Sequence, residues 1–338
     1  MHVELVLPAL FSATESAPVL PALQLCLARA RRDAEERLSL ESWLGEAFGL
    51  GLEEQPLPAG ALTALASGAA PGTRTWLRAD PVHLRADRDR ALLLPNEAFA
   101  IAADEAEGLA RSLEPLLEGR FLLHRVSPAQ WCLEVLEGKA AGASARAPID
   151  LAGADVDRNL PDKAWHPLLT ELQMAMYDHP VNTAREARSE PVINSVWLWG
   201  EGPLPASARG PWHSVTADHL PARGLADLAD LRHRERPEDA AAWLDRAPED
   251  GRHLVVLDAL RGVAQLGDTD GAARRLAQLE SQWIAPLLAA LKAGRIGMLT
   301  LHVPESGDRF ELVRGDLRRF WRRPRPLPAY APPLPAER

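Results

Sequence analysis

Lysine, cysteine and long apolar runs are all scarce in this chain of 338 residues. Lysine occurs only at Lys139, Lys163 and Lys292, whereas arginine and alanine abound; a GC-rich genome explains this bias, which carries no functional information. The two cysteines, Cys26 and Cys132, lack the CxxC spacing of zinc and redox sites, so they fit a reducing compartment.

The lack of long apolar runs, the N-terminal sequence and the net charge bear on localisation and partners. No uncharged apolar run reaches the roughly 18 residues that a membrane-spanning helix needs. The N-terminus, MHVELVLPALF, has no basic segment, and Glu4 interrupts its apolar run, which argues against a signal peptide. The net charge of −9 disfavours nucleic acid as a partner. We therefore expect a cytoplasmic protein with no membrane and no nucleic-acid partner.

Apolar strands and amphipathic helices alternate along most of the chain, whose length fits one large α/β domain or two smaller ones. Apolar runs predict strands at 3–7, 192–199, 212–217, 253–260 and 296–303. Helical spacing predicts helices near 19–30, 40–47, 162–177 and 271–294, the last ending at Gly294 and open to a kink at Pro286. This alternation is typical of a doubly wound α/β fold with a largely parallel sheet.

Residues 75–150 interrupt the alternation. Strand-like segments at 75–87, 91–95, 121–127 and 130–136 surround one helix at 104–117, which predicts a small inserted α+β domain. Loop-like residues flank it on both sides. We expect core segments at 1–74 and 161–325, the inserted domain at 75–160, and a Pro-rich tail at 326–338 with little tendency to fold.

The segment 179–205, HPVNTAREARSEPVINSVWLWGEGPLP, has the most distinctive pattern. Its strand runs into Gly200 and Gly202, where glycines let the backbone approach a ligand beyond the carboxyl end of a strand. A tight turn without any ligand is the alternative. Trp197 and Trp199 share one strand face, for which core packing is expected and a stacking surface is the alternative.

This block, with HPVN, Arg185, and a strand containing Asn194 and LWGEGPLP, resembles the archaeal-type cofactor-independent phosphoglycerate mutases of the alkaline-phosphatase superfamily. It looks closer still to a bacterial family of phosphoglycerate-mutase-like, or RpfE-type, regulatory proteins. Weaker similarity extends to the inserted domain at 75–94 and to a late helix at 267–288. The resemblance implies an alkaline-phosphatase-like fold, a serine nucleophile and two divalent metals, commonly manganese.

The metal ligands that the resemblance implies are largely missing from this chain. An acid is expected after the first strand, an Asp and a His in a late segment, and an aspartate beside a histidine on the last strand. The residues found at these places are Pro8, Arg261, Gln265 and Leu301. Gly267, Asp268 and His302 survive, whereas Ser12 and Ser16 lack the context of the nucleophile. Because one histidine does not hold two metals, we expect no catalytic residue, no metal site and no cofactor.

Two further groups of polar residues stand out. Arg318, Arg319, Arg322, Arg323 and Arg325 surround Phe320 and Trp321. This segment could bind a phosphate or carboxylate, dock an acidic partner, or simply be solvated. His213, Asp218 and His219 match no zinc spacing, so ordinary hydrogen-bonded roles are expected for them.

We therefore expect a non-catalytic regulatory or binding protein that takes a small anionic ligand or a protein partner. The predicted ligand-binding residues are Arg185, Asn194, Gly200, Gly202, His302, Arg322 and Arg323. The alternative is an active phosphoglycerate mutase or phosphatase that uses a divalent metal such as manganese.

Overall fold

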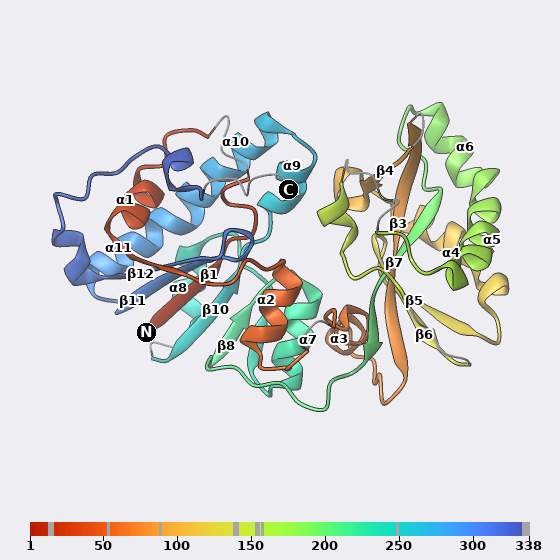
Figure 1. Cartoon of the computed structure of the whole chain (residues 1–338), viewed down its shortest axis with the longest axis horizontal. Helices are drawn as coiled ribbons and strands as arrows, with labels where there is room; N and C mark the ends of the chain where they lie inside the picture. Colours follow the sequence, from red (N-terminus) through yellow and green to blue (C-terminus); the bar gives the residue numbers. More distant parts are fainter. Residues whose placement is uncertain are drawn as a thin grey trace. The chain divides into compact units, whose positions relative to one another are not determined.

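The chain forms two compact units in a computed structural model (Figure 1). The first comprises Met1–Gly49 and Arg209–Arg338, and the second comprises Leu50–Ala208. The structure describes residues 1–12, 17–52, 55–87, 90–137, 142–152, 156, 159–247 and 250–332. None of the helices in this described part combines the length and the apolar character that crossing a membrane requires.

A mostly parallel sheet organises the first unit. Its strands, within the described residues, follow the order β2-β12-β11-β1-β10-β8-β9. Their bounds are β1 (His2–Val6), β2 (Arg31–Ala34), β8 (Ser214–Thr216), β9 (Arg232–Arg234), β10 (Arg252–Val256), β11 (Met298–Val303) and β12 (Asp308–Val313). The five strands from β11 to β9 run parallel, while β12 runs antiparallel to both β11 and β2. The predicted parallel arrangement of 3–7, 253–260 and 296–303 is therefore confirmed.

Helices cover both faces of this sheet (Figure 1). They are α1 (Pro21–Arg29), α2 (Leu40–Ala47), α7 (Leu220–Leu228), α8 (Ala240–Arg246), α9 (Leu260–Gln265), α10 (Thr269–Gln278) and α11 (Ala285–Ala293). A π-helical segment, Leu279–Ile284, joins α10 to α11, so the predicted long helix is continuous and ends at Gly294 in a left-handed conformation. Pro286, which has no amide N–H to donate, falls in the first turn of α11, directly after that π-helical segment.

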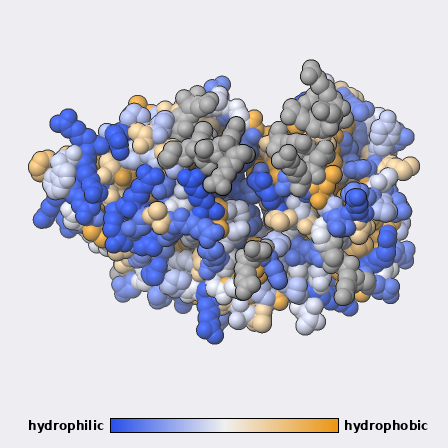
Figure 2. Space-filling view, in the orientation of Figure 1, coloured by the Kyte–Doolittle hydropathy of each residue, from blue (hydrophilic) through white to orange (hydrophobic). Residues whose placement is uncertain are grey.

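The main core of the first unit lies on one face of the sheet. Alternate residues of the central strands, such as Leu5, Val255 and Leu301, pack there against α1, α8 and α11. Hydrophilic side chains cover much of the visible surface of this unit (Figure 2).

The second unit is built on an antiparallel sheet around the long strand β3. Its strands are β3 (Thr75–Asp87), β4 (Arg90–Pro95), β5 (Phe121–Ser127), β6 (Gln130–Val135) and β7 (Ser195–Pro203). The order is β4-β3-β6-β5, and β7 pairs with β3. Its helices are α3 (Ala59–Ala66), α4 (Ala103–Leu117), α5 (His166–Tyr177) and α6 (Pro180–Ala187). The whole chain is thus a mixed α/β protein with one mostly parallel and one antiparallel sheet.

The predicted placement of 192–199 in the parallel sheet is wrong, because β7 pairs antiparallel with β3. The strand is apolar on both faces because both faces are covered. Leu198 packs with α4 and α5, whereas Trp197 and Trp199 pack with Ala59 of α3 on the other side. A strand buried between two layers has the same apolar pattern in either kind of sheet. Both tryptophans serve core packing, as the sequence favoured.

Two further expectations differ from the structure. The second unit extends from Leu50 to Ala208, beyond the expected insertion at 75–160, because β7 joins its sheet, α3 and α5 pack on that sheet, and α6 packs against α4. The described part of the Pro-rich tail is packed rather than unfolded: Leu327 and Tyr330 are buried in the core of the first unit. Residues 333–338 of that tail lie outside the described residues.

Short 3-10 segments are η1 (Asn96–Ala98), η2 (Pro148–Leu151), η4 (Lys163–Trp165), η6 (Pro304–Ser306), η7 (Arg314–Arg318) and η8 (Leu327–Tyr330).

Candidate functional site

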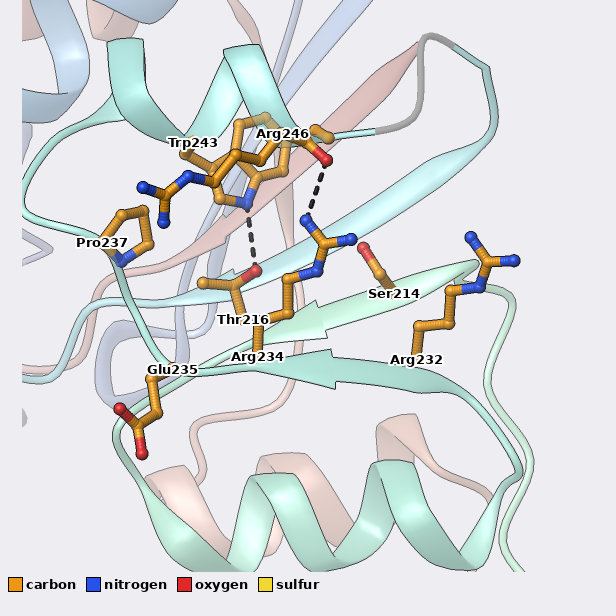
Figure 3. A pocket seen from close by; sticks show the side chains of 9 residues that line it. Ser214, Thr216, Arg232, Arg234, Glu235, Pro237, Trp243 and Arg246 are labelled. Atoms are coloured by element: carbon orange, nitrogen blue, oxygen red, sulfur yellow. Dashed lines mark hydrogen bonds between the residues drawn. The ribbon is translucent and has the colours of Figure 1, made fainter.

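A cavity of about 340 Å³ lies in the first unit between strand β8, the edge strand β9 and helix α8 (Figure 3). Hydroxyl, guanidinium and aromatic groups line it together. The lining residues are Ser214 and Thr216 of β8, Arg232 and Arg234 of β9, Trp243 and Arg246 of α8, and the neighbouring Glu235, Pro237 and Ala247. The cavity is large enough for a small organic molecule.

Strand register explains why these side chains converge. Ser214 pairs with Arg232, and Thr216 pairs with Arg234, in the parallel ladder of β8 and β9. Alternate residues of a strand share one face, so all four side chains project toward α8. Trp243 of α8 fixes the helix above them, because its Nε1 donates to Thr216 Oγ1 at 3.0 Å. The site is therefore placed by regular secondary structure.

The cavity is strongly cationic. Arg234 Nη1 donates to the carbonyl oxygen of Arg246 at 2.8 Å, where it caps the end of α8 (Figure 3). In the described part of the chain, the guanidinium groups of Arg232 and Arg246 make no hydrogen bond or ion pair. Glu235 does not neutralise them: it points to the other side of β9, and its carboxylate contacts Arg223 at 3.3 Å. Guanidinium groups free of such partners can bind a phosphate or carboxylate with paired hydrogen bonds.

One lining residue, Ser214, is hydrogen-bonded to a buried histidine behind the cavity wall. Ser214 Oγ lies 2.8 Å from His253 Nδ1, and His253 Nε2 lies 3.0 Å from the carbonyl oxygen of Asp250. Because that carbonyl only accepts, Nε2 carries the proton and Nδ1 accepts the hydrogen bond from Ser214. Burial lowers the pKa of His253, outweighing the hydrogen bond to Asp250, and nearby His213 lowers the pKa further. The imidazole is therefore neutral at pH 7.

The positions at which the resemblance places metal ligands do not fit a metal. Arg261, at the place of an expected aspartate, donates from Nη1 and Nη2 to the buried carboxylate of Glu41, at 3.0 and 2.9 Å. His219 Nε2 lies 3.3 Å from the same carboxylate. Although burial would raise the pKa of Glu41, Arg261 and His219 hold it well below its usual range. A cation paired in this way cannot donate to a metal, and neither can the side chains of Pro8 and Leu301.

No group of three or more His, Cys, Asp or Glu side chains suited to a metal ion occurs within the residues that the structure describes.

His302 belongs to an ionic network on the sheet face opposite the main core. Its Nε2 lies 3.2 Å from Oε2 of Glu4, and its ring packs against Trp43 at 5.0 Å between centroids. Gly200 and Gly202, the expected neighbours of His302 in a cleft, belong to the second unit. The shared cleft therefore stays a prediction.

Arg185 and Asn194, for which a ligand role was predicted, make structural contacts inside the second unit. Arg185 is 1% exposed, donates to Glu105 Oε2 at 2.6 Å and also binds the carbonyl oxygens of Pro191 and Ala100. Asn194 accepts from the amide of Leu84 at 2.7 Å and donates to its carbonyl at 2.8 Å. These contacts account for both side chains without a ligand, and the ligand role stays a prediction.

Gly200 and Gly202 are required by close packing of the backbone. Gly200 has φ +61°, and a Cβ there would lie 2.6 Å from Cβ of Ala59. A Cβ at Gly202, where φ is +155°, would lie 2.9 Å from Cβ of Pro58. Both glycines lie within β7 and allow the start of α3 to pack on this strand, so close packing rather than a tight turn accounts for them.

Arg322 and Arg323 lie in an exposed but anchored segment of the first unit. Arg322 Nη1 donates to the carbonyl oxygen of Ala30 at 2.8 Å, at the end of α1. Beside them, Phe320 and Trp321 are 77% and 66% exposed. The segment is therefore held on the surface, with Arg323 open to solvent.

Sequence reasoning missed the cavity arginines, although one signal was present. The alternation Arg232-His233-Arg234 places two arginines on one face of a short strand, but a strand this polar resembles a loop. Ser214 lay in the predicted strand 212–217 without any visible partner, because His253 is 39 residues away.

Comparison with known proteins shows distant similarity to solved structures. No protein-family model and no curated protein matches the chain. Its structure is similar to the PH0037 protein from Pyrococcus horikoshii, with 12% sequence identity and a TM-score of 0.54, over 92% of this chain and 86% of that one. A cofactor-independent phosphoglycerate mutase from Thermoplasma acidophilum DSM 1728 shows 15% identity and a TM-score of 0.41, over 93% and 90% of the two chains. At this identity the first likeness concerns the fold.

Proposed function

We propose that the protein binds a small molecule carrying a phosphate or carboxylate group in the cavity between β8, β9 and α8. The observation that carries this proposal is the convergence of Arg232, Arg234 and Arg246 on one cavity, with two of the three guanidinium groups unengaged by any described residue. Cationic side chains without a carboxylate partner attract an anion, which would offset their charge. The wall of Trp243 offers an apolar surface to the rest of the ligand.

The same proposal assigns the chain to the phosphoglycerate-mutase-like, RpfE-type proteins of the alkaline-phosphatase superfamily, as a regulatory or binding member without metal-dependent phosphoryl transfer. Two features support this assignment. The 179–205 block carries the resemblance, and Pro8, Leu301 and Arg261 stand where metal ligands are expected. Arg261, at one of these places, is instead paired with the buried carboxylate of Glu41.

Anion binding should depend on the cavity arginines. We expect inorganic phosphate and phosphoglycerate to bind to the wild-type protein in a calorimetric titration. Arg232→Gln should weaken this binding about 10- to 100-fold, because a hydrogen bond to a charged group contributes roughly 1.5–3 kcal/mol. Arg232 is the cleanest position, since no described residue relies on its side chain.

The matched control is Arg323→Gln, which removes the same charge from an exposed arginine of the same unit. It should leave the affinity unchanged. Equal weakening by both substitutions would favour a general effect of charge, and weakening by Arg323→Gln alone would move the anion site to the C-terminal segment that the sequence suggested.

Metal content separates this proposal from the alternative of an active mutase or phosphatase. We expect purified protein, analysed by inductively coupled plasma mass spectrometry, to hold far less than one manganese or zinc ion per chain. The reason is that proline, leucine and arginine side chains donate no electron pair to a metal. Two tightly held transition metals per chain would restore the alternative.

A further inference from the structure

Ser214 has the surroundings of an activated nucleophile. Its hydroxyl donates to His253 Nδ1, and the carbonyl of Asp250 fixes the tautomer that leaves Nδ1 free to accept a proton. His253 is fully buried beside Trp243, so its ring is held in place, whereas Ser214 lines the cavity that holds the arginines. A hydroxyl next to an oriented neutral imidazole is the arrangement that makes serine reactive.

We infer that Ser214 attacks the carbonyl carbon of a carboxylic ester whose anionic group is held by the cavity arginines. This inference rests on the proposed anion site and adds covalent chemistry to it. The substrate class is a small ester that carries a phosphate or a second carboxylate. The metal positions expected from the resemblance take no part, because Ser214 and His253 lie on β8 and β10.

The reaction balances without a cofactor. Oγ of Ser214 bonds to the carbonyl carbon while its proton passes to His253 Nδ1. The ester C–O bond then breaks, and the departing alkoxide takes the proton from His253 to leave as an alcohol. Water next adds to the acyl-serine and gives a proton to His253, which returns it to Oγ as the carboxylic acid is released. Arg234, on the same cavity wall, is placed to stabilise the negative charge that develops on the carbonyl oxygen.

A fluorophosphonate probe tests this inference on the full-length protein. Its phosphorus bonds to a reactive serine as fluoride leaves, so we expect one adduct per chain, located on Ser214 by peptide mass spectrometry. Ser214→Ala should abolish the adduct, while Ser281→Ala, at an exposed serine of the same unit, should not change it. His253→Gln should slow labelling at least about 100-fold, in line with the usual contribution of a general base.

Two readouts distinguish reactivity from a structural role. Labelling of the wild type should decline at acid pH as His253 gains a proton, and His253→Gln should lose that dependence. Inorganic phosphate should slow labelling by occupying the arginines. Phosphate binding without any adduct on wild-type Ser214 would overturn this inference and leave the proposed function standing. An adduct on Ser214 that phosphate neither slows nor competes with, together with absent calorimetric binding, would overturn the proposed anion site instead.

Discussion

Replacing Asp80 by alanine is expected to lower the free energy of unfolding of the second unit by roughly 3–5 kcal/mol, the usual cost of leaving a buried charge without its partner. Asp80 is 3% exposed on β3. Its Oδ1 accepts from Arg78 Nη2 at 2.6 Å, and its Oδ2 accepts from Trp199 Nε1 at 2.7 Å. The guanidinium of Arg78 is equally buried, so the substitution leaves a buried cation without its carboxylate partner. Urea unfolding, monitored through hydrogen exchange of the β3 amides, measures this decrease in the free energy of unfolding.

Two variants sharpen this experiment. Glu171→Ala removes an exposed carboxylate from α5 of the same unit and should change stability by less than about 0.5 kcal/mol. The double variant Arg78→Met, Asp80→Ala removes both charges and should recover most of the loss, because an apolar pair needs no counterion. If Asp80→Ala cost no more than Glu171→Ala, the buried pair would have no stabilising role.

The sequence predicted the elements of this fold better than their assembly. Apolar periodicity located β1, β3, β10 and β11, because each depends on residues adjacent in the chain. The sheet to which β7 belongs is decided by its pairing with β3, which lies more than 100 residues earlier in the chain. The two apolar faces of β7 are compatible with either sheet. Pairing over such distances leaves no local signal, so the assignment followed the commoner alternation of α/β folds.

The same limit applies to the site residues: local sequence could not show which of them lie together. Arginine and glycine often mark ligand loops, which is why the sequence singled out Arg185, Gly200 and Gly202. In the structure, Arg185 is paired with Glu105, and the two glycines allow close packing of the backbone. Ser214 and His253 lie on strands that neighbour each other in space but not in sequence. Arg232 and Arg234 were hidden by the polarity of their short strand. The chemistry of this site is a property of strand register, which residue types alone do not disclose.

The stability of the first unit should fall as acid protonates Glu4. Although burial alone would raise the pKa of this carboxylate, hydrogen bonds from His302 and Arg252 lower it to about 2. A lowered pKa means that the contribution of Glu4 is fully present above about pH 4.5 and is lost as the pH falls toward 2. At ~1.4 kcal/mol for each unit of pKa, this contribution amounts to roughly 3 kcal/mol.

His302 should impose the opposite dependence at higher pH. Burial lowers its pKa, but the nearby carboxylate of Glu35, 3.9 Å from Nδ1, and the hydrogen bond to Glu4 outweigh burial and raise the pKa above 6.5. Its contribution is therefore present below pH 6.5 and is lost as the pH rises through the folded-state pKa. The network is most stabilising between about pH 4.5 and 6.5. Glu4→Gln should flatten urea-derived stability on both sides of this window, whereas Glu46→Gln, at an exposed carboxylate of α2, should preserve both slopes. Slopes that survive Glu4→Gln would place the pH response outside this network, since Glu4 is the group that binds both Arg252 and His302.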